Sequence, residues 1–356
     1  MTTPTLHTPS TSPRAGLVGL GAMGSGMAQS LRRAGHAPYV YDVRPGVAQA
    51  FARGGGKDGA PDDAPDGEQA GGTVCQTLAE LGAACDVVVS VVVNAAQTES
   101  VLFGSGGEPG CAASMKPGSV FVMCSTVDPN WSVALEARLQ ALGLLYIDAP
   151  ISGGAAKAAS GQMTMMTAGR PEAYAVAQPL LDAMAAKVYR LGSSAGAGSK
   201  VKIINQLLAG VHIAAAAEAM ALGLREGVDA AALYEVITHS AGNSWMFENR
   251  MAHVLAGDYT PLSAVDIFVK DLGLVLDVAR ASKFPLPLSS TAHQMFMQAS
   301  TAGFAREDDS AVIKIFPGIT LPGSAEQSTE NSSGKPPEAP PETRLEATAP
   351  HPGKSG

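Results

Sequence analysis

Lys202 and Asn205 are the residues whose types and spacing first suggest chemistry in this sequence. They lie one helical turn apart, so both should project from the same face of a helix, in its first turn. A lysine near a helix N-terminus meets the positive end of the dipole, and partial burial would lower its pKa further. An amine that titrates near neutral pH can take and return a proton. The alternative is an ordinary lysine whose ammonium group reaches solvent.

A long helix over residues 199–225 must position this pair. The segment contains no proline and is rich in alanine, leucine, isoleucine and valine, which favour helix. It is apolar almost all round, which predicts burial between domains. Its length approaches the roughly 20 residues of a membrane span. Five polar residues argue against a span, because such groups are costly in lipid: Lys200, Lys202, Asn205, His212 and Glu218.

A glycine-rich turn early in the chain predicts a dinucleotide site. A buried strand over 15–19 runs into a G-x-G-x-x-G pattern, a helix reaching Arg32 and a second strand over 37–41. Asp42 ends that strand, where a carboxylate can bond both ribose hydroxyls of NAD and repel the 2′-phosphate of NADP. Arg44 stands nearby and could soften this exclusion. The residues of the turn are Gly19, Leu20, Gly21, Ala22, Met23 and Gly24.

Polar residues follow three further predicted strands, over 86–93, 118–123 and 144–148. The carboxyl ends of parallel strands share one edge of a sheet, where open α/β sheets bind ligands. Serine, threonine and asparagine are also common helix caps, which is the alternative at each position. The site candidates after these strands are Asn94, Thr126, and the loop Ser152, Gly153 and Gly154.

The order of elements predicts an α/β Rossmann domain, with a doubly wound and mostly parallel sheet, followed by an all-α domain. The long helix should join the two. Strands over 162–168 and 187–191, with a helix over 171–185 between them, complete the first domain; helices over 230–239, 264–282 and 289–302 build the second. We expect a disordered N-terminus 1–14, a dinucleotide-binding domain 15–193 with a disordered insertion 54–72, a helical domain 194–322 and a disordered tail 323–356.

Composition excludes several classes of protein. The chain has 356 residues, a net charge of −8 and no basic patch, so we expect neither nucleic acid nor a membrane as partner. The four cysteines, at 75, 85, 111 and 124, fit neither a metal site nor a disulfide framework. No secretory signal is visible near Met1, so a cytoplasmic enzyme or binding protein is expected.

The motifs together resemble the β-hydroxyacid dehydrogenases, which include 3-hydroxyisobutyrate dehydrogenase and are related to 6-phosphogluconate dehydrogenase. The resemblance covers about residues 15–321 apart from the insertion. It rests on four stretches: Gly-Leu-Gly-Ala-Met-Gly at 19–24, Asp-Ala-Pro-Ile-Ser-Gly-Gly at 148–154, Gly-x-Gly-x-x-x-Lys-x-x-Asn at 196–205, and Lys-Asp-Leu at 270–272.

The resemblance implies hydride transfer between a small hydroxy acid and NAD, with NADP the less favoured cofactor. Lys202 falls on the family's catalytic lysine, and the loop at Ser152 on its carboxylate-binding loop. Thr126 and Lys270 fall beside the cofactor. The family often has two asparagines after the lysine; here Gln206 follows Asn205, so only Asn205 is carried over. A homodimer or homotetramer is expected by the same analogy.

Within the family, the stretches 91–99, 101–104 and 307–316 resemble members that oxidise the sugar acid L-threonate. Asn243 and Ser244, with Trp245 and Phe247 beside them, could contact its hydroxyls, unless they only cap a helix. The alternatives are a 3-hydroxyisobutyrate or other short hydroxy-acid dehydrogenase, an imine reductase, and a non-catalytic cofactor-binding protein. Lys202 argues against the last two.

Overall fold

The computed structural model describes residues 12–54 and 71–323. The predictions for the remaining residues, including most of the insertion and the tail, lie outside these ranges. The predicted disordered N-terminus 1–14 is too long, because Arg14 is held by Asp86. The Arg14 backbone N–H donates to Asp86 Oδ2 at 2.9 Å, and Arg14 Nη2 donates to Asp86 Oδ1 at 3.3 Å. Gly71 and Gly72 likewise belong to the ordered chain that leads into the next strand.

A nine-stranded sheet forms the first part of the molecule, with order β3-β2-β1-β4-β5-β6-β8-β7 and β9 beside β8. Strands β1 to β6 pair in parallel, whereas β8 runs antiparallel to β6 and β7, so the predicted mostly parallel sheet is confirmed. The strands are β1 Ala15–Val18, β2 Tyr39–Tyr41, β3 Thr73–Val74, β4 Val87–Ser90, β5 Val120–Met123, β6 Leu145–Asp148, β7 Ile151–Ser152, β8 Met163–Gly169 and β9 Ala185–Arg190.

Helices cover both faces of this sheet, because alternate residues of its buried strands face two separate cores. Val87 and Val89 pack with α1 and α7 on one face, and Val88 packs with α3 and α5 on the other. These helices are α1 Ala22–Arg33, α2 Val47–Ala52, α3 Leu78–Ala84, α4 Ala95–Phe103, α5 Pro129–Ala141, α6 Gly154–Ala159 and α7 Pro171–Met184, with a 3-10 turn at Ala112–Ser114.

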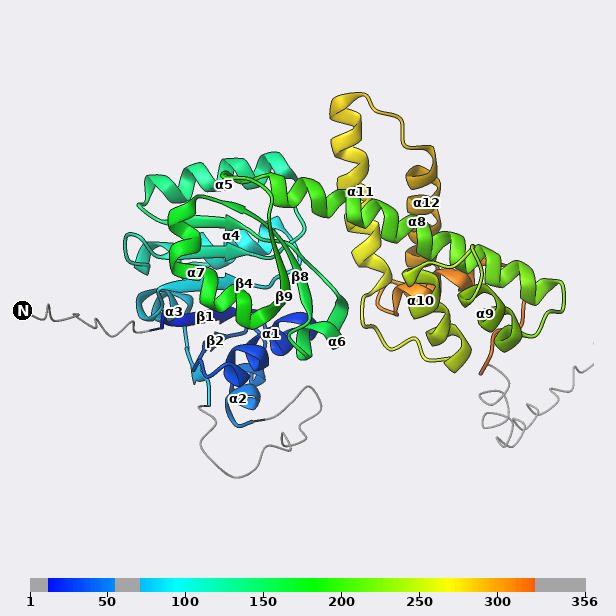
Figure 1. Ribbon diagram of the computed structural model, residues 1–356, viewed down its shortest axis with the longest axis horizontal. Coiled ribbons are helices and arrows are strands. Elements are labelled where there is room, and N and C mark those ends of the chain that lie inside the picture. The colour runs from blue at the N-terminus through cyan, green and yellow to red at the C-terminus, as the bar shows by residue number, and fades with distance from the viewer. Residues whose placement is uncertain (1–11, 55–70, 324–356) are drawn as a thin grey trace, which may run out of the picture.

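The second part contains helices and, within its described residues, no strand (Figure 1). Its largest element, α8, runs from the sheet to the far end of the helical part, and α10, α11 and α12 pack on it. The helices are α8 Ala197–Arg225, α9 Ala230–Thr238, α10 Trp245–Ala256, α11 Val265–Ser282 and α12 Pro287–Ala299, followed by a π-helical turn Ser300–Phe304 and a 3-10 helix Asp309–Ile315.

Two predictions about α8 need correction. The helix begins at Ala197, so Lys202 and Asn205 lie beyond its first turn. The helix is also not buried all round: Ile204, Leu208 and Leu222 are 59%, 51% and 62% exposed. Among the described residues, α8 alone has the length and hydropathy of a membrane span, and 44% of that window is buried within the protein. Packed helices therefore cover part of the surface of α8, and solvent reaches another part.

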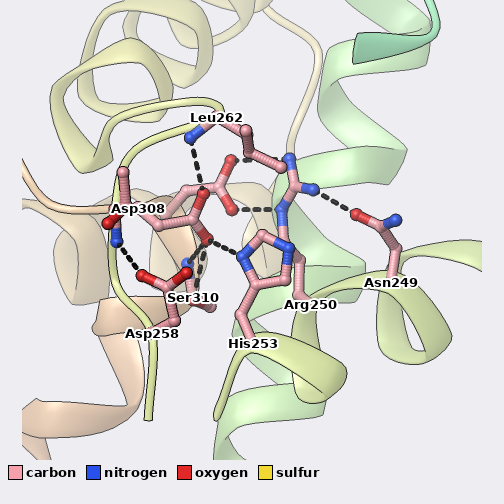
Figure 2. A network of polar contacts seen from close by, with 9 residues as sticks. Asn249, Arg250, His253, Asp258, Leu262, Asp308 and Ser310 are labelled. Carbon is pink, nitrogen blue, oxygen red and sulfur yellow. Dashed lines mark hydrogen bonds and ion pairs between the residues drawn. The ribbon is translucent and has the colours of Figure 1, made fainter. Parts of the chain in front are cut away.

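A group of charged residues is buried inside the helical part (Figure 2). The Arg250 guanidinium on α10 forms two hydrogen bonds to the Asp309 carboxylate, one from Nη2 to Oδ2 at 3.1 Å and one from Nε to Oδ1. Its neighbour Asp308 accepts bonds from the Leu262 backbone N–H and from the Ser310 backbone N–H and hydroxyl. Burial raises the pKa of Asp309 to about 6, and the Arg250 charge opposes that rise.

Candidate active site

Lys202 is buried in the second turn of α8, where it is 7% exposed. Its Nζ donates a hydrogen bond to Gln206 Oε1 at 2.8 Å. Burial lowers the pKa of the amine from 10.5 to about 8, Asp271 opposes this shift and Lys270 adds to it. The predicted depressed pKa is therefore confirmed, and the main cause is loss of water around the charge. An amine in this range exchanges protons readily near neutral pH.

Gln206 connects Lys202 to the helical part. Its Nε2 donates to Asp271 Oδ2 at 2.5 Å, and its Oε1 also accepts from Asn205 Nδ2 at 3.1 Å. Gln206 and Asp271 are 8% and 2% exposed, so this contact is shielded from solvent. Both residues were noted with the sequence motifs, but neither was assigned a role. The signal that could have assigned Gln206 a role is its spacing of four from Lys202, which places two side chains on one helical face.

Lys270 connects α11 to the sheet. Its Nζ donates to the Thr126 carbonyl oxygen at 3.2 Å and to Asp271 Oδ1 at 2.5 Å. Thr126 follows β5, so a strand end of the sheet and a helix of the second part meet at this ammonium group. The structure therefore brings Lys202, Asn205, Lys270 and Thr126 into one connected polar group, as expected for residues of a single site.

The beginning of α8 is fixed to the sheet by Asp148, the last residue of β6. Its Oδ2 accepts the backbone N–H groups of Gly196 and Ser199, each at 2.9 Å, and its Oδ1 accepts the Ser199 hydroxyl at 2.7 Å. Burial raises the pKa of this carboxyl group, while the bonds from Ser199 and Gly196 lower it. A carboxylate at a helix N-terminus also meets the positive end of the dipole. Asp148 thus sets where Lys202 lies relative to the sheet.

The turn at 19–24 has the shape that a dinucleotide requires. Gly19 has φ of 92°, and a Cβ on Gly24 would lie 1.8 Å from the Gly19 carbonyl oxygen, so only glycine fits there. The space beside Gly21 is open to 4 Å, and α1 begins immediately after it. Helix N-termini favour anions. The residues therefore fit the pyrophosphate of NAD between β1 and α1.

Asp42 lies next to this turn and is already paired. Its Oδ2 accepts the Leu20 backbone N–H at 2.7 Å, and the Arg44 guanidinium forms bonds at 2.9 Å to both carboxylate oxygens. Burial raises the pKa of Asp42, but Arg44 and the Leu20 N–H outweigh it and hold the pKa below its usual value. The Arg44 side chain is 57% exposed, so it can leave the carboxylate without disturbing the core.

The loop after β6 contains an exposed backbone turn. Ser152 pairs with Thr164 of β8, and its hydroxyl makes no hydrogen bond within the described chain. Gly153 has φ of 141° and lies against the side chain of Lys157, where an added Cβ would approach to 2.9 Å. The Lys157 ammonium lies 5.7 Å from the ring centroid of Trp245, which opens α10. The two parts of the molecule thus face each other across this loop. No hydrogen bond joins the loop to Lys202 among the residues described.

Two of the polar candidates cap helices. The Asn94 side chain accepts the Gln97 N–H at 2.9 Å and caps α4, and Ser244 accepts the Phe247 N–H at 3.0 Å and caps α10. Asn243 does not cap: its Nδ2 donates to the Thr238 carbonyl at 3.0 Å, while its Oδ1 is buried without a partner. The capping alternative therefore holds for Ser244 and fails for Asn243.

Family models match both parts of the chain. Residues 14–192 match the NAD binding domain of 6-phosphogluconate dehydrogenase, and residues 196–316 match a domain described as the NAD-binding domain of NADP-dependent 3-hydroxyisobutyrate dehydrogenase. The boundary between the two models falls just before α8.

Individual proteins agree with this assignment. L-threonate dehydrogenase of Cupriavidus necator is 66% identical over 311 residues, covering 87% of this chain and 98% of that protein. The mouse mitochondrial 3-hydroxyisobutyrate dehydrogenase is 31% identical, covering 84% and 85%. A solved structure described as 3-hydroxyisobutyrate dehydrogenase from Salmonella typhimurium aligns with a TM-score of 0.77 at 50% identity, covering 86% and 100%. The chain therefore belongs to the 3-hydroxyisobutyrate dehydrogenase-like family of NAD(P)-dependent hydroxy-acid dehydrogenases.

Proposed function

We propose that this enzyme oxidises L-threonate at its C2 hydroxyl to 2-dehydro-L-erythronate, with Lys202 as the general acid and base. The observation that carries the proposal is the buried Lys202 amine, whose pKa is about 8 and whose hydrogen-bonded neighbours reach Thr126 at a strand end of the dinucleotide-binding domain. An alcohol loses a hydride and a proton on oxidation, so the reaction needs a hydride acceptor and a base.

Bound NAD supplies the acceptor for the hydride that leaves C2. The residues that would hold it are those of the glycine turn with Asp42, Asn94, Thr126 and Lys270. The neutral Lys202 amine takes the hydroxyl proton, and the Lys202 ammonium returns it in the reverse direction. The N–H groups and the free hydroxyl of the Ser152, Gly153 and Gly154 loop bind the substrate carboxylate, while Asn205 contacts the substrate hydroxyl beside Lys202.

The relatives support the choice of a four-carbon sugar acid. The similarity to L-threonate dehydrogenases, 66% for Cupriavidus necator and 52% for Escherichia coli K12, is well above that to 3-hydroxyisobutyrate dehydrogenases. A substrate with several hydroxyls also needs polar partners, because a buried unpaired polar group costs about 1–3 kcal/mol. The Asn243 Oδ1, which has no partner among the described residues, is one acceptor of the right kind, two residues before the Trp245 ring that lies beside Lys157.

The test compares kcat/KM for L-threonate, D-erythronate and 3-hydroxyisobutyrate, each with NAD and with NADP. L-threonate with NAD should be preferred. A preference for 3-hydroxyisobutyrate would leave the family intact and overturn the substrate; no turnover of any hydroxy acid would favour the non-catalytic alternative.

We also propose a homodimer or homotetramer in a reducing, cytoplasmic compartment. The exposed apolar side chains of α8 support association, because such residues are costly to leave in water. The four cysteines are free and buried, as expected where disulfides do not form. Light scattering after size-exclusion chromatography should give two or four chains; a monomer would contradict the association.

A further inference from the structure

Gln206 holds its amide group in a single orientation between a donor and an acceptor. Its Oε1 accepts from Lys202 Nζ at 2.8 Å and from Asn205 Nδ2 at 3.1 Å, while its Nε2 donates to Asp271 Oδ2 at 2.5 Å. A rotated amide would bring its NH₂ toward the two donors and its oxygen toward the carboxylate. Both ends would then be mismatched, and Lys202, Gln206 and Asp271 are shielded from water that could repair the mismatch.

The orientation matters for the lone pair of the neutral lysine. An amine whose N–H points to an acceptor keeps its lone pair free for a substrate proton. An amine that faces an NH₂ donor instead uses its lone pair to accept that hydrogen bond and cannot act as a base. The amide oxygen of Gln206 therefore keeps Lys202 in a competent arrangement.

We propose that Asp271 is a positioning residue of the reaction, which acts on Lys202 through the Gln206 amide. Its carboxylate makes no direct hydrogen bond to the amine in the described structure: its Oδ2 bonds Gln206 and its Oδ1 bonds Lys270. The same carboxylate fixes Lys270, which in turn bonds the Thr126 carbonyl. One acidic residue of α11 thus orders both lysines at the junction of the two parts.

The charged groups that face Lys202 set the expected direction of each test. Asp271 raises the pKa of the amine and Lys270 lowers it, both from α11. Asp271→Asn should therefore lower the Lys202 pKa, by about 1 unit, and release the amide, so that kcat falls about 10- to 100-fold. Gln206→Glu should raise the pKa, because a carboxylate then lies beside the amine.

The decisive variant combines the two changes. In Gln206→Glu/Asp271→Asn, the carboxylate introduced at position 206 can accept from Lys202 and from the amide introduced at position 271. The order of donors and acceptors is then restored with unchanged net charge. We expect this double variant to regain at least 10-fold in kcat over Asp271→Asn, with the Lys202 pKa above that of the natural protein. Asp277→Asn is the matched control, since Asp277 lies on the same helix and bonds only exposed Arg280 in the described structure.

The rate measurements rest on L-threonate being the substrate, so a second measurement that needs no substrate tests the role of Asp271 independently. The Lys202 pKa is measured without substrate by NMR of ¹³C-labelled lysine, with the resonance assigned by its loss in Lys202→Met. The rates are then measured with L-threonate and NAD over pH. A double variant no faster than Asp271→Asn, or an Asp271→Asn protein with an unmoved Lys202 pKa and only a lower Tm, would overturn the positioning role. If L-threonate is not a substrate, the NMR titrations still test the effect of Asp271 on Lys202.

Discussion

Two groups of buried charged residues in the described chain are connected in different ways. In the helical part, Arg250 contacts the Asp309 carboxylate directly through two hydrogen bonds (Figure 2). At the junction with the sheet, the neutral Gln206 amide separates Lys202 from Asp271. A direct carboxylate contact would stabilise the ammonium form and raise its pKa. The comparison indicates that a direct contact compensates both buried charges, whereas an inserted amide leaves the amine free to react.

Removing the amine should produce the largest loss of activity. Lys202→Met retains the length and apolar volume of the side chain but removes the base, so kcat should fall about 10²- to 10⁴-fold. Titration of NAD by intrinsic fluorescence should show unchanged binding. Lys200→Met is the control, because Lys200 is an exposed neighbour on the same helix. A Lys202→Met enzyme within a few-fold of the natural rate would exclude Lys202 as the base.

Removing one partner of the direct pair should affect stability instead. Asp309→Ala leaves the Arg250 charge buried without its carboxylate, which should lower the free energy of unfolding by about 3–5 kcal/mol. Adding Arg250→Met should recover most of this loss, since a buried ion pair can be replaced by apolar groups. Urea unfolding measures both, and kcat of the folded fraction should stay within a few-fold. Equal losses in the single and double variants would contradict this account.

The pH dependence of the rate should reflect the protonation of Lys202, and not that of Asp309. Lys202 is protonated below its pKa of about 8 and cannot then accept a proton. The kcat/KM for oxidation should therefore fall about tenfold for each pH unit below that value and level off above it. Reduction of the ketone needs the ammonium form, so its rate should decline above a pH of about 8. If the pH–rate profile instead changes slope near pH 6, which is about the pKa of Asp309, and not near pH 8, the base is a group other than Lys202.

A third pair, between Asp42 and exposed Arg44, should give the smallest effect. Asp42→Ala removes the carboxylate beside the glycine turn, so NAD binding should weaken by about tenfold and NADP binding by less. Arg44→Ala should leave NAD binding nearly unchanged. Dissociation constants from cofactor fluorescence test both variants. Equal weakening of NAD and NADP in Asp42→Ala would show that Asp42 does not select the cofactor.

Sequence reasoning found the elements whose patterns are local. The glycine turn, the β-branched run at 86–93 and the lysine on the long helix are each visible within a few residues, although the strand itself spans only Val87–Ser90. Helix α10 was missed because its buried face includes Arg250, whose partner Asp309 comes 59 residues later. The contact of Asp271 with Gln206 was missed for a related reason, since the two residues are 65 positions apart in the sequence. Contacts between distant segments depend on packing that no local pattern encodes.

The helical geometry of α8 sets a limit on how this protein can vary. The helix has 29 residues and so a length of about 43 Å, with its first turn held by Asp148. Each residue advances a helix by about 100° around its axis. One residue inserted or deleted between Gly196 and Lys202 would therefore turn the amine away from Asp271 by more than a quarter of a circle. Loops at the surface can change length in homologous enzymes. The number of residues between Gly196 and Lys202 cannot change, because each added or removed residue rotates Lys202 around the helix axis.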